Sequence, residues 1–156
     1  MQTTLLALTL LVFAGLIHVG EETLTGFIKW FKEFVGFPIS VTEDIVVNAI
    51  FLVALVIGAL VYNAYPIFSL GAVGFVFINS WFHVIGTIKL RKYSPGLISA
   101  TLLYLPLSLY AYYLIVGSGV VTALSLAYSI VISLILYFGG TFGIHIIYVR
   151  TKHAIE

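Results

Sequence analysis

Apolar residues form five long stretches of this chain, and short polar stretches separate them. Each stretch has about 20 residues or more, the length with which an α-helix crosses the roughly 30 Å hydrocarbon layer of a bilayer. The predicted transmembrane helices run near 3–25, 43–65, 67–88, 95–116 and 120–149. We therefore expect an all-α membrane protein, in which residues 1–156 form a single transmembrane domain built as a bundle of five helices.

A shorter amphipathic segment follows the first predicted helix. Between 27 and 34, aromatic residues recur at helical spacing, and Lys29 and Lys32 lie among them. This pattern is typical of a helix that lies in the membrane interface. Pro38 ends the segment. Glu43 and Asp44 then fall in the first turn of the second predicted helix, where the positive end of the helix dipole gives them a structural role.

The composition agrees with a lipid environment and limits the chemistry. Hydrophobic residues make up 62% of the chain and charged residues 8%, and the mean hydropathy is +1.17. Soluble domains carry roughly 25% charged residues. The formal net charge of +1 gives no case for a nucleic-acid partner. Because the sequence has no cysteine, disulfides, thiolate metal ligands and a cysteine nucleophile are excluded.

The basic residues predict how the chain is oriented. They all follow the first, third or fifth predicted helix, and the loops after the second and fourth helices have none: the set is Lys29, Lys32, Lys89, Arg91, Lys92, Arg150 and Lys152. By the positive-inside rule, that side of the membrane is cytoplasmic. We therefore expect an integral protein of the cell membrane, with its N-terminus outside and its C-terminus in the cytoplasm.

Several polar residues inside the predicted helices fall at similar depths. With a rise of about 1.5 Å per residue from the nearest basic residue, Glu22, His83 and His145 lie roughly 7 to 11 Å inside the cytoplasmic boundary. His18 and Glu22 are four residues apart and so share one face of the first helix, together with Glu21. The matched depths predict one polar layer in the cytoplasmic half of the bilayer.

Two asparagines extend this layer. Asn48 enters it from the second predicted helix, whereas Asn79 lies deeper and projects from the same face as His83. In the fifth helix, the glycines of "GGTFG", residues 139–143, allow a bend or a close approach to a neighbouring helix just before His145.

The polar residues resemble those of a known family. The motif formed by His18, Glu21 and Glu22, with "NSWFHVIGT" at 79–87 and "RKYSPG" at 91–96, is similar to the HXXEE-domain proteins, small polytopic membrane proteins of unknown function. The resemblance implies that the three motif residues act as a unit. A weaker analogy links the double glutamate to the CAAX-type intramembrane glutamic proteases, although Gly26 stands where those enzymes have an arginine.

Imidazoles and carboxylates without thiolates suit a divalent metal such as Zn²⁺ or Fe²⁺. A hydrolytic zinc site needs three protein ligands and an open position for water. We expect these ligands to come from His83 and His145, completed by His18 or Glu22.

The remaining polar residues supply the other catalytic roles. Glu21 is the predicted general base, and Asn48 or Asn79 is the predicted donor to a developing oxyanion. Together these residues indicate a membrane-embedded, metal-dependent hydrolase or lipid-modifying enzyme that acts on a lipid or amphipathic substrate.

Other function classes fit the same residues. The histidines and glutamates also suit a proton-coupled carrier, and His83 with His145 suits a haem-binding electron-transfer subunit. A non-catalytic subunit of a larger membrane complex would use the tyrosine- and leucine-rich fourth helix as a contact surface, and a carrier with five helices per protomer would require a homo-oligomer. His83 alone or His145 alone is also consistent with a structural hydrogen bond to a neighbouring helix.

Overall fold

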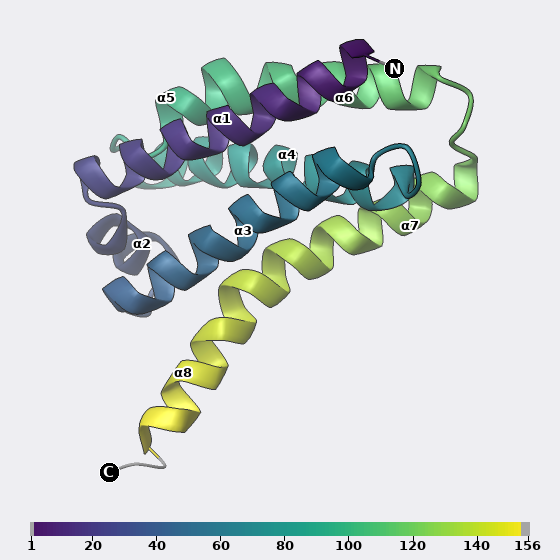
Figure 1. Ribbon diagram of the computed structural model, residues 1–156. Helices are drawn as coiled ribbons and strands as arrows, with labels where there is room; N and C mark the ends of the chain where they lie inside the picture. Colours follow the sequence, from purple (N-terminus) through teal and green to yellow (C-terminus); the bar gives the residue numbers. More distant parts are fainter. Residues whose placement is uncertain (1, 154–156) are drawn as a thin grey trace.

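The computed structural model describes residues 2–153, with side chains through Arg150, and this part of the chain is helical without β-strands (Figure 1). Its helices that are long and apolar enough to cross a membrane comprise Gln2–Thr25, Val41–Val61, Pro66–Leu90, Leu97–Gly117 and Ala123–Arg150. The prediction of an all-α protein with five such helices is confirmed.

Three of the spanning helices are uninterrupted, and two contain a π-helical stretch. The uninterrupted ones are α1 (Gln2–Thr25), α3 (Val41–Val61) and α4 (Pro66–Leu90). The fourth spanning helix consists of α5 (Leu97–Ser99), η1 (Ala100–Tyr104) and α6 (Leu105–Gly117). The fifth consists of α7 (Ala123–Leu134), η2 (Ile135–Gly143) and α8 (Ile144–His153), and η2 includes the whole glycine-rich run.

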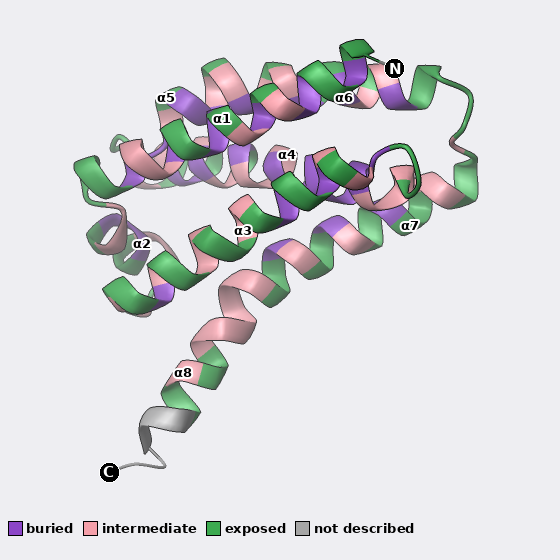
Figure 2. Ribbon diagram, in the orientation of Figure 1, coloured by how far each residue is buried: buried purple, intermediate pink, exposed green. Residues whose placement is uncertain are grey.

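Helix α4 lies at the centre of the bundle, where α3, α6 and α7 pack against it. Its residues from Ser69 to Val76 are all buried, and Figure 2 shows buried positions on the visible turns of α4. Ser133 of α7 donates a hydrogen bond to the carbonyl of Gly71, with Oγ and O 3.0 Å apart, so polar and van der Waals contacts together join the two helices. A side chain carried by α4 therefore lies close to several other helices.

The predicted amphipathic segment is helix α2 (Phe27–Val35), which crosses the end of the bundle between α1 and α3. Trp30 and Phe31 on its inner face are buried. The indole of Trp30 lies against Gly86 of α4, where a Cβ would be 2.3 Å from Trp30 Cζ2. The absence of a side chain at Gly86 thus allows α2 to pack closely on the end of α4.

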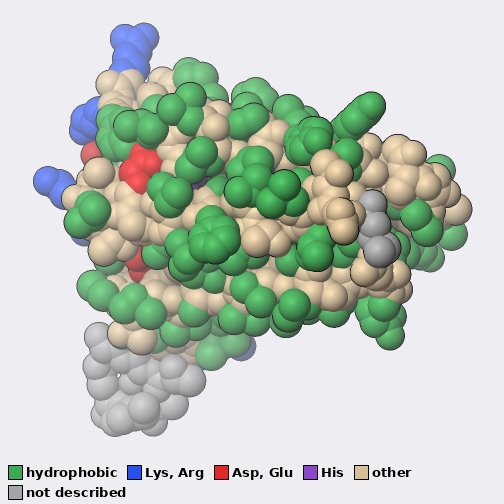
Figure 3. Space-filling model, turned by 45° about the horizontal axis from the view of Figure 1, so that its top comes forward, with side chains coloured by type: hydrophobic (Ala, Val, Ile, Leu, Met, Phe, Trp, Pro, Cys, Tyr) green, Lys and Arg blue, Asp and Glu red, His purple; other side chains and the backbone are tan. Residues whose placement is uncertain are grey.

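Figure 3 shows most of the lysine and arginine side chains that the structure describes gathered at the end of the molecule that α2 covers. The long sides of the bundle carry exposed large hydrophobic side chains, among them Leu10, Val53, Ile85, Leu109 and Ile130. A hydrophobic circumference with a charged end is the surface expected of a helix bundle in a bilayer.

Candidate metal centre

The site begins with two residues of α1 that lie one helical turn apart. His18 and Glu22 are buried, with exposed fractions of 2% and 4%. The four-residue spacing places both side chains on the same face. Nε2 of His18 lies 3.5 Å from Oε1 of Glu22.

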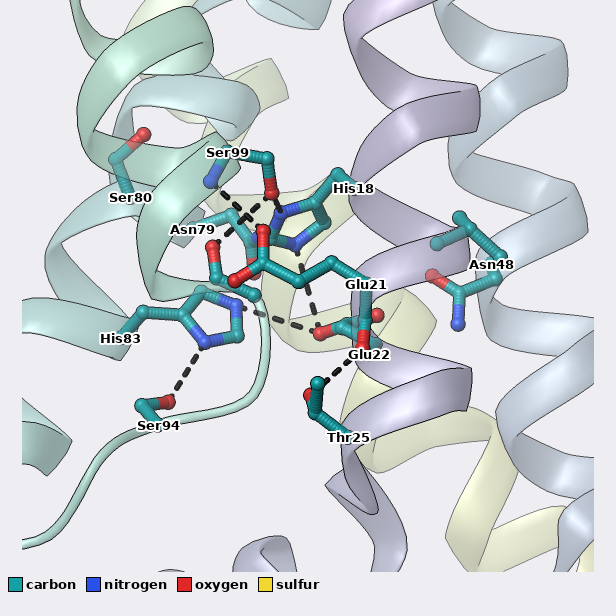
Figure 4. Close-up of polar contacts among 12 residues, drawn as sticks. His18, Glu21, Glu22, Thr25, Asn48, Asn79, Ser80, His83, Ser94 and Ser99 are labelled. Atoms are coloured by element: carbon teal, nitrogen blue, oxygen red, sulfur yellow. Dashed lines mark hydrogen bonds and ion pairs between the residues drawn. The ribbon is translucent and has the colours of Figure 1, made fainter.

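His83 of α4 meets this pair from the opposite side. It is fully buried, and its Nε2 lies 3.3 Å from the same Glu22 Oε1 without a hydrogen-bond partner among the described residues. The rings of His18 and His83 are nearly perpendicular, with centroids 4.8 Å apart. One ligand atom from each of the three residues lies within 4.8 Å of the other two, and Figure 4 shows the side chains turned toward one another.

Serine hydroxyls hold the other nitrogen of each imidazole. Nδ1 of His18 lies 2.8 Å from Ser99 Oγ, and Nδ1 of His83 lies 2.8 Å from Ser94 Oγ. Because Ser99 Oγ donates its hydrogen to the carbonyl of Gly96, it accepts from Nδ1–H of His18. His18 then presents an unprotonated Nε2 toward Glu22. A hydrogen bond on the far nitrogen is the usual way in which proteins orient metal-binding histidines.

Asn79 makes a further contact at the same nitrogen. Its Nδ2 lies 3.0 Å from Nε2 of His18, so the amide donates to the imidazole lone pair. A metal ion bound to His18 would take the place of this hydrogen bond. Asn79 is therefore placed to occupy the ligand nitrogen when no ion is bound.

Two of the three spacings between ligand atoms fit tetrahedral coordination, and all three atoms lie within 4.8 Å of one another. Bonds of about 2.0 to 2.2 Å from Zn²⁺ to nitrogen and oxygen place neighbouring ligand atoms roughly 3.3 to 3.5 Å apart. Glu22 Oε1 lies 3.3 Å from His83 Nε2 and 3.5 Å from His18 Nε2. Small side-chain adjustments would bring all three atoms to bonding distance.

The loop after α4 closes over the site at Gly96. This residue has φ of +95°, which favours glycine, and an added Cβ would lie 2.7 Å from His18 Cε1 and 2.8 Å from His83 Cε1. The loop packs directly on both imidazoles. Aromatic rings enclose them further, since Tyr104 lies 4.6 Å from His18 and Trp30 lies 6.0 Å from His83 between ring centroids.

A small cavity adjoins the three residues. The space open to the centres of water molecules has a volume of about 40 Å³. The residues that line the cavity include His18, Glu22, Asp44, Asn48 and Asn79. One water needs roughly 10 to 15 Å³ on this measure, so the cavity accommodates a few water molecules. The site thus combines converging ligand atoms with space for a reactant beside them.

Comparison with known families identifies the group to which this arrangement belongs. Residues 9–111, well over half of the chain, match the family model described as a protein of unknown function with HXXEE motif. The chain belongs to the HXXEE family. No curated protein and no solved structure matches the chain. In this HXXEE protein the motif comprises His18, Glu21 and Glu22. His18 and Glu22 lie together in the candidate metal centre, whereas Glu21 makes other contacts.

Glu21 of the HXXEE motif, the predicted general base, is not among the residues that line the cavity. Its Oε1 accepts from the backbone N–H of Ile98 at 3.0 Å, and its Oε2 accepts from that of Ser99 at 2.8 Å. Tyr93 also donates to this carboxylate. Partial burial and the Glu21 carboxylate raise the pKa of Tyr93 to about 12, so the phenol stays protonated at neutral pH. Glu21 caps the fourth spanning helix and positions Ser99.

His145 is likewise not part of the group formed by His18, Glu22 and His83. Its Nδ1 lies 2.6 Å from Oε1 of Glu43, and its ring stacks on Phe37 with centroids 4.5 Å apart. The other carboxylate oxygen of Glu43 accepts a hydrogen bond from the backbone N–H of Ser40. The Ser40 hydroxyl in turn accepts from the backbone N–H of Glu43 and so caps α3. His145 therefore has a helix-cap partner, because the fifth spanning helix meets α3 at this level.

The remaining predicted residues line the cavity. Asn48 Nδ2 donates to Asp44 Oδ1 at 3.3 Å, and both residues line the cavity together with Glu22. The sequence predicted only a structural role for Asp44, in the first turn of its helix, and did not predict that it lines the site. The four-residue spacing from Asp44 to Asn48 was the available signal, since it places both side chains on one helix face.

Proposed function

We propose that this HXXEE protein is a metal-dependent hydrolase of the membrane interior that acts on a lipid or another amphipathic substrate. His18, Glu22 and His83 are the three protein ligands of its divalent ion, either Zn²⁺ or Fe²⁺. The observation that carries the proposal is the convergence of three buried ligand atoms on one point, where the Nε2 atom of His83 has no hydrogen-bond partner among the described residues.

Burial explains why this group favours a cation. A carboxylate removed from water is costly unless an opposite charge and hydrogen bonds compensate it. No lysine or arginine among the described residues forms an ion pair with Glu22, and the contacts that it makes are with His18 and His83. A divalent ion between the three residues would neutralise the carboxylate and bind the Nε2 atoms of both imidazoles.

The cavity residues supply the rest of the chemistry. A metal with three protein ligands leaves one position for water and lowers the pKa of that water toward neutrality. Asp44 lines the same cavity and would serve as the base for this water, whose oxygen would add to the ester carbon. Asn48 would donate to the developing oxyanion, and the departing alcohol would take the proton back from Asp44.

The positive-inside rule places this site in the cytoplasmic half of the membrane, with the N-terminus outside and the C-terminus inside. The support is the location of the basic side chains at the end of the molecule that α2 covers. Haem ligation by His83 and His145 has little support, since Nε2 of His83 faces Glu22 and His145 bonds Glu43.

The proposal is tested by the metal content of the purified protein. We expect about one zinc or iron per chain in the wild type, and a loss of at least about tenfold in affinity in Glu22→Gln and His83→Ala, as ligand removal would produce. His145→Ala is the matched control and should keep its metal. A correctly folded wild type that binds no divalent metal would overturn the proposal and leave a proton shared between Glu22 and the imidazoles as the function of the cluster.

A further inference from the structure

A large groove runs beside the candidate metal centre, between the end of α1, helix α2 and the start of α3. It has a volume of about 620 Å³. Glu22 and Asp44 line both this groove and the small cavity. A molecule that lies in the groove therefore reaches one metal ligand and the proposed base.

The outer part of the groove carries positive charge from Lys29 and Lys32 of α2. Neither lysine has an ion-pair partner among the described residues. The other lysines at this end of the molecule differ in that respect. Lys92 pairs with Glu33, and Lys89 lies 5.0 Å from the ring centre of Phe34. The two groove lysines are thus free to bind an anion.

The walls of the groove are apolar and open to the surrounding lipid. Ile28, Val41 and Ile45 line it, and Val41 and Ile45 are exposed to 63% and 61%. In a bilayer these side chains would contact hydrocarbon. A ligand suited to this groove has an anionic head next to the lysines and an apolar chain along α3.

We infer that the groove binds a glycerophospholipid with an anionic headgroup and that this lipid is the substrate, so the inference rests on the proposed function. Lys29 and Lys32 bind the headgroup phosphate. The carboxylate of Asp44, which is not a metal ligand, repels the phosphate from the inner end, which leaves the uncharged acyl ester as the group nearest the metal centre. Glu22 lies three residues before the end of α1, about 4.5 Å along the axis, a depth suited to ester groups below the phosphates.

The reaction is hydrolysis of an acyl ester. Water adds its oxygen to the ester carbonyl carbon, the bond from that carbon to the glycerol oxygen breaks, and the glycerol oxygen takes up a proton. The products are a fatty acid and a lysophospholipid, and no oxidant, reductant or second substrate is consumed.

The experiment measures lipid retention and metal content in the same samples of full-length protein. Purified protein is exposed to mixed micelles with equal phosphatidylglycerol and phosphatidylcholine of the same acyl chains, and bound lipid is quantified by mass spectrometry. We expect a preference of roughly tenfold or more for phosphatidylglycerol, since each lysine near an anionic lipid contributes appreciably to binding. Lys29→Gln with Lys32→Gln should abolish the preference, whereas Lys89→Gln with Lys92→Gln should retain it.

Hydrolysis is then followed as release of fatty acid from phosphatidylglycerol by the metal-loaded protein, with Glu22→Gln as the inactive control. Equal retention of both lipids by a metal-binding wild type would overturn this inference and leave the proposed metal centre intact. Displacement of the lipid by millimolar inorganic phosphate would also overturn it, because the lysines would then form a free-phosphate site. Selective retention without bound metal would overturn the substrate role together with the proposed function.

Discussion

Two buried glutamates of this protein each contact histidine, and their surroundings differ. Glu43 and Glu22 are both 4% exposed. Glu43 accepts a hydrogen bond from Ser40 N at 2.6 Å and lies 2.6 Å from His145 Nδ1, so its contacts are short and complete. Glu22 lies 3.3 and 3.5 Å from two imidazoles, one of which has an Nε2 without a hydrogen-bond partner among the described residues.

The difference separates a structural pair from a candidate binding site. A carboxylate and a histidine at hydrogen-bond distance need no further ligand, and helix capping already explains Glu43. The longer distances around Glu22 leave space for a cation between one carboxylate oxygen and two imidazole nitrogens, which are the atom types that bind Zn²⁺. Proximity of histidine and glutamate alone is therefore weak evidence for a metal site. Several ligand atoms around one point, with a buried nitrogen that lacks a hydrogen-bond partner among the described residues, are stronger evidence.

The largest expected effect concerns Asp44, which lines the cavity together with Glu22. Asp44→Asn should lower turnover of the anionic lipid by roughly 10² to 10⁴, the usual contribution of a general base, because the amide cannot accept a proton. Metal content should stay at the wild-type level, since Asp44 is not a ligand. Fatty-acid release and metal analysis on the same preparation check both statements. Full activity in this variant would assign the base to another group.

The next effect tests how tightly the loop at Gly96 packs on the imidazoles. Gly96→Ala should lower the free energy of unfolding by about 2 to 4 kcal/mol and weaken metal binding, because it adds both backbone strain and a clash with His18 and His83. Gly119→Ala is the matched control, with φ of +75° and no atom near the added Cβ. It should cost only about 1 kcal/mol. Denaturant titration in detergent measures both, and equal costs would show that the loop does not press on the site.

A change in the pair formed by Glu43 and His145 should lower stability and leave metal binding unchanged. His145→Ala should lower the free energy of unfolding by about 1 to 2 kcal/mol, because it leaves the Glu43 carboxylate without one partner. Metal affinity and turnover should not change. Thermal unfolding and metal titration provide the readouts. A metal loss as large as that of His83→Ala would place His145 in the coordination sphere after all.

The smallest effect concerns the donor to Glu21. Tyr93→Phe removes one hydrogen bond at a half-exposed position and should cost about 0.5 to 1 kcal/mol at pH 8. Because the pKa of Tyr93 is raised from 10 to about 12 in the folded protein, its contribution is complete below pH 10 and is lost as the pH rises through 12. The stability difference between wild type and variant should therefore shrink over that range. A difference that grows with pH would contradict the assignment.

The helices and much of the site follow from the sequence, for identifiable reasons. Apolar length defines a spanning helix whatever its neighbours. Depth along each helix predicted Glu22 and His83 at one level, and the four-residue spacing placed His18 on the face of Glu22. Depth does not determine which neighbour a side chain faces, so His145 at the same level meets Glu43 instead. The roles of Ser94 and Ser99 depend on a loop whose packing is set by the tertiary fold.

The cap formed by Glu21 also has a consequence for biogenesis. Helix α1 is synthesised first, and the backbone amides of Ile98 and Ser99 that Glu21 binds come 77 and 78 residues later. Until the fourth spanning helix leaves the translocon, the Glu21 carboxylate must keep contact with water or lipid headgroups at the membrane surface. A nascent chain that ends before residue 97 would already contain His18, Glu22 and His83, yet it would lack the backbone amides that hold the Glu21 carboxylate in place. Arrival of the fourth helix is then the step at which this end of α1 sinks to its final depth, so assembly of the centre is coupled to the order of translation.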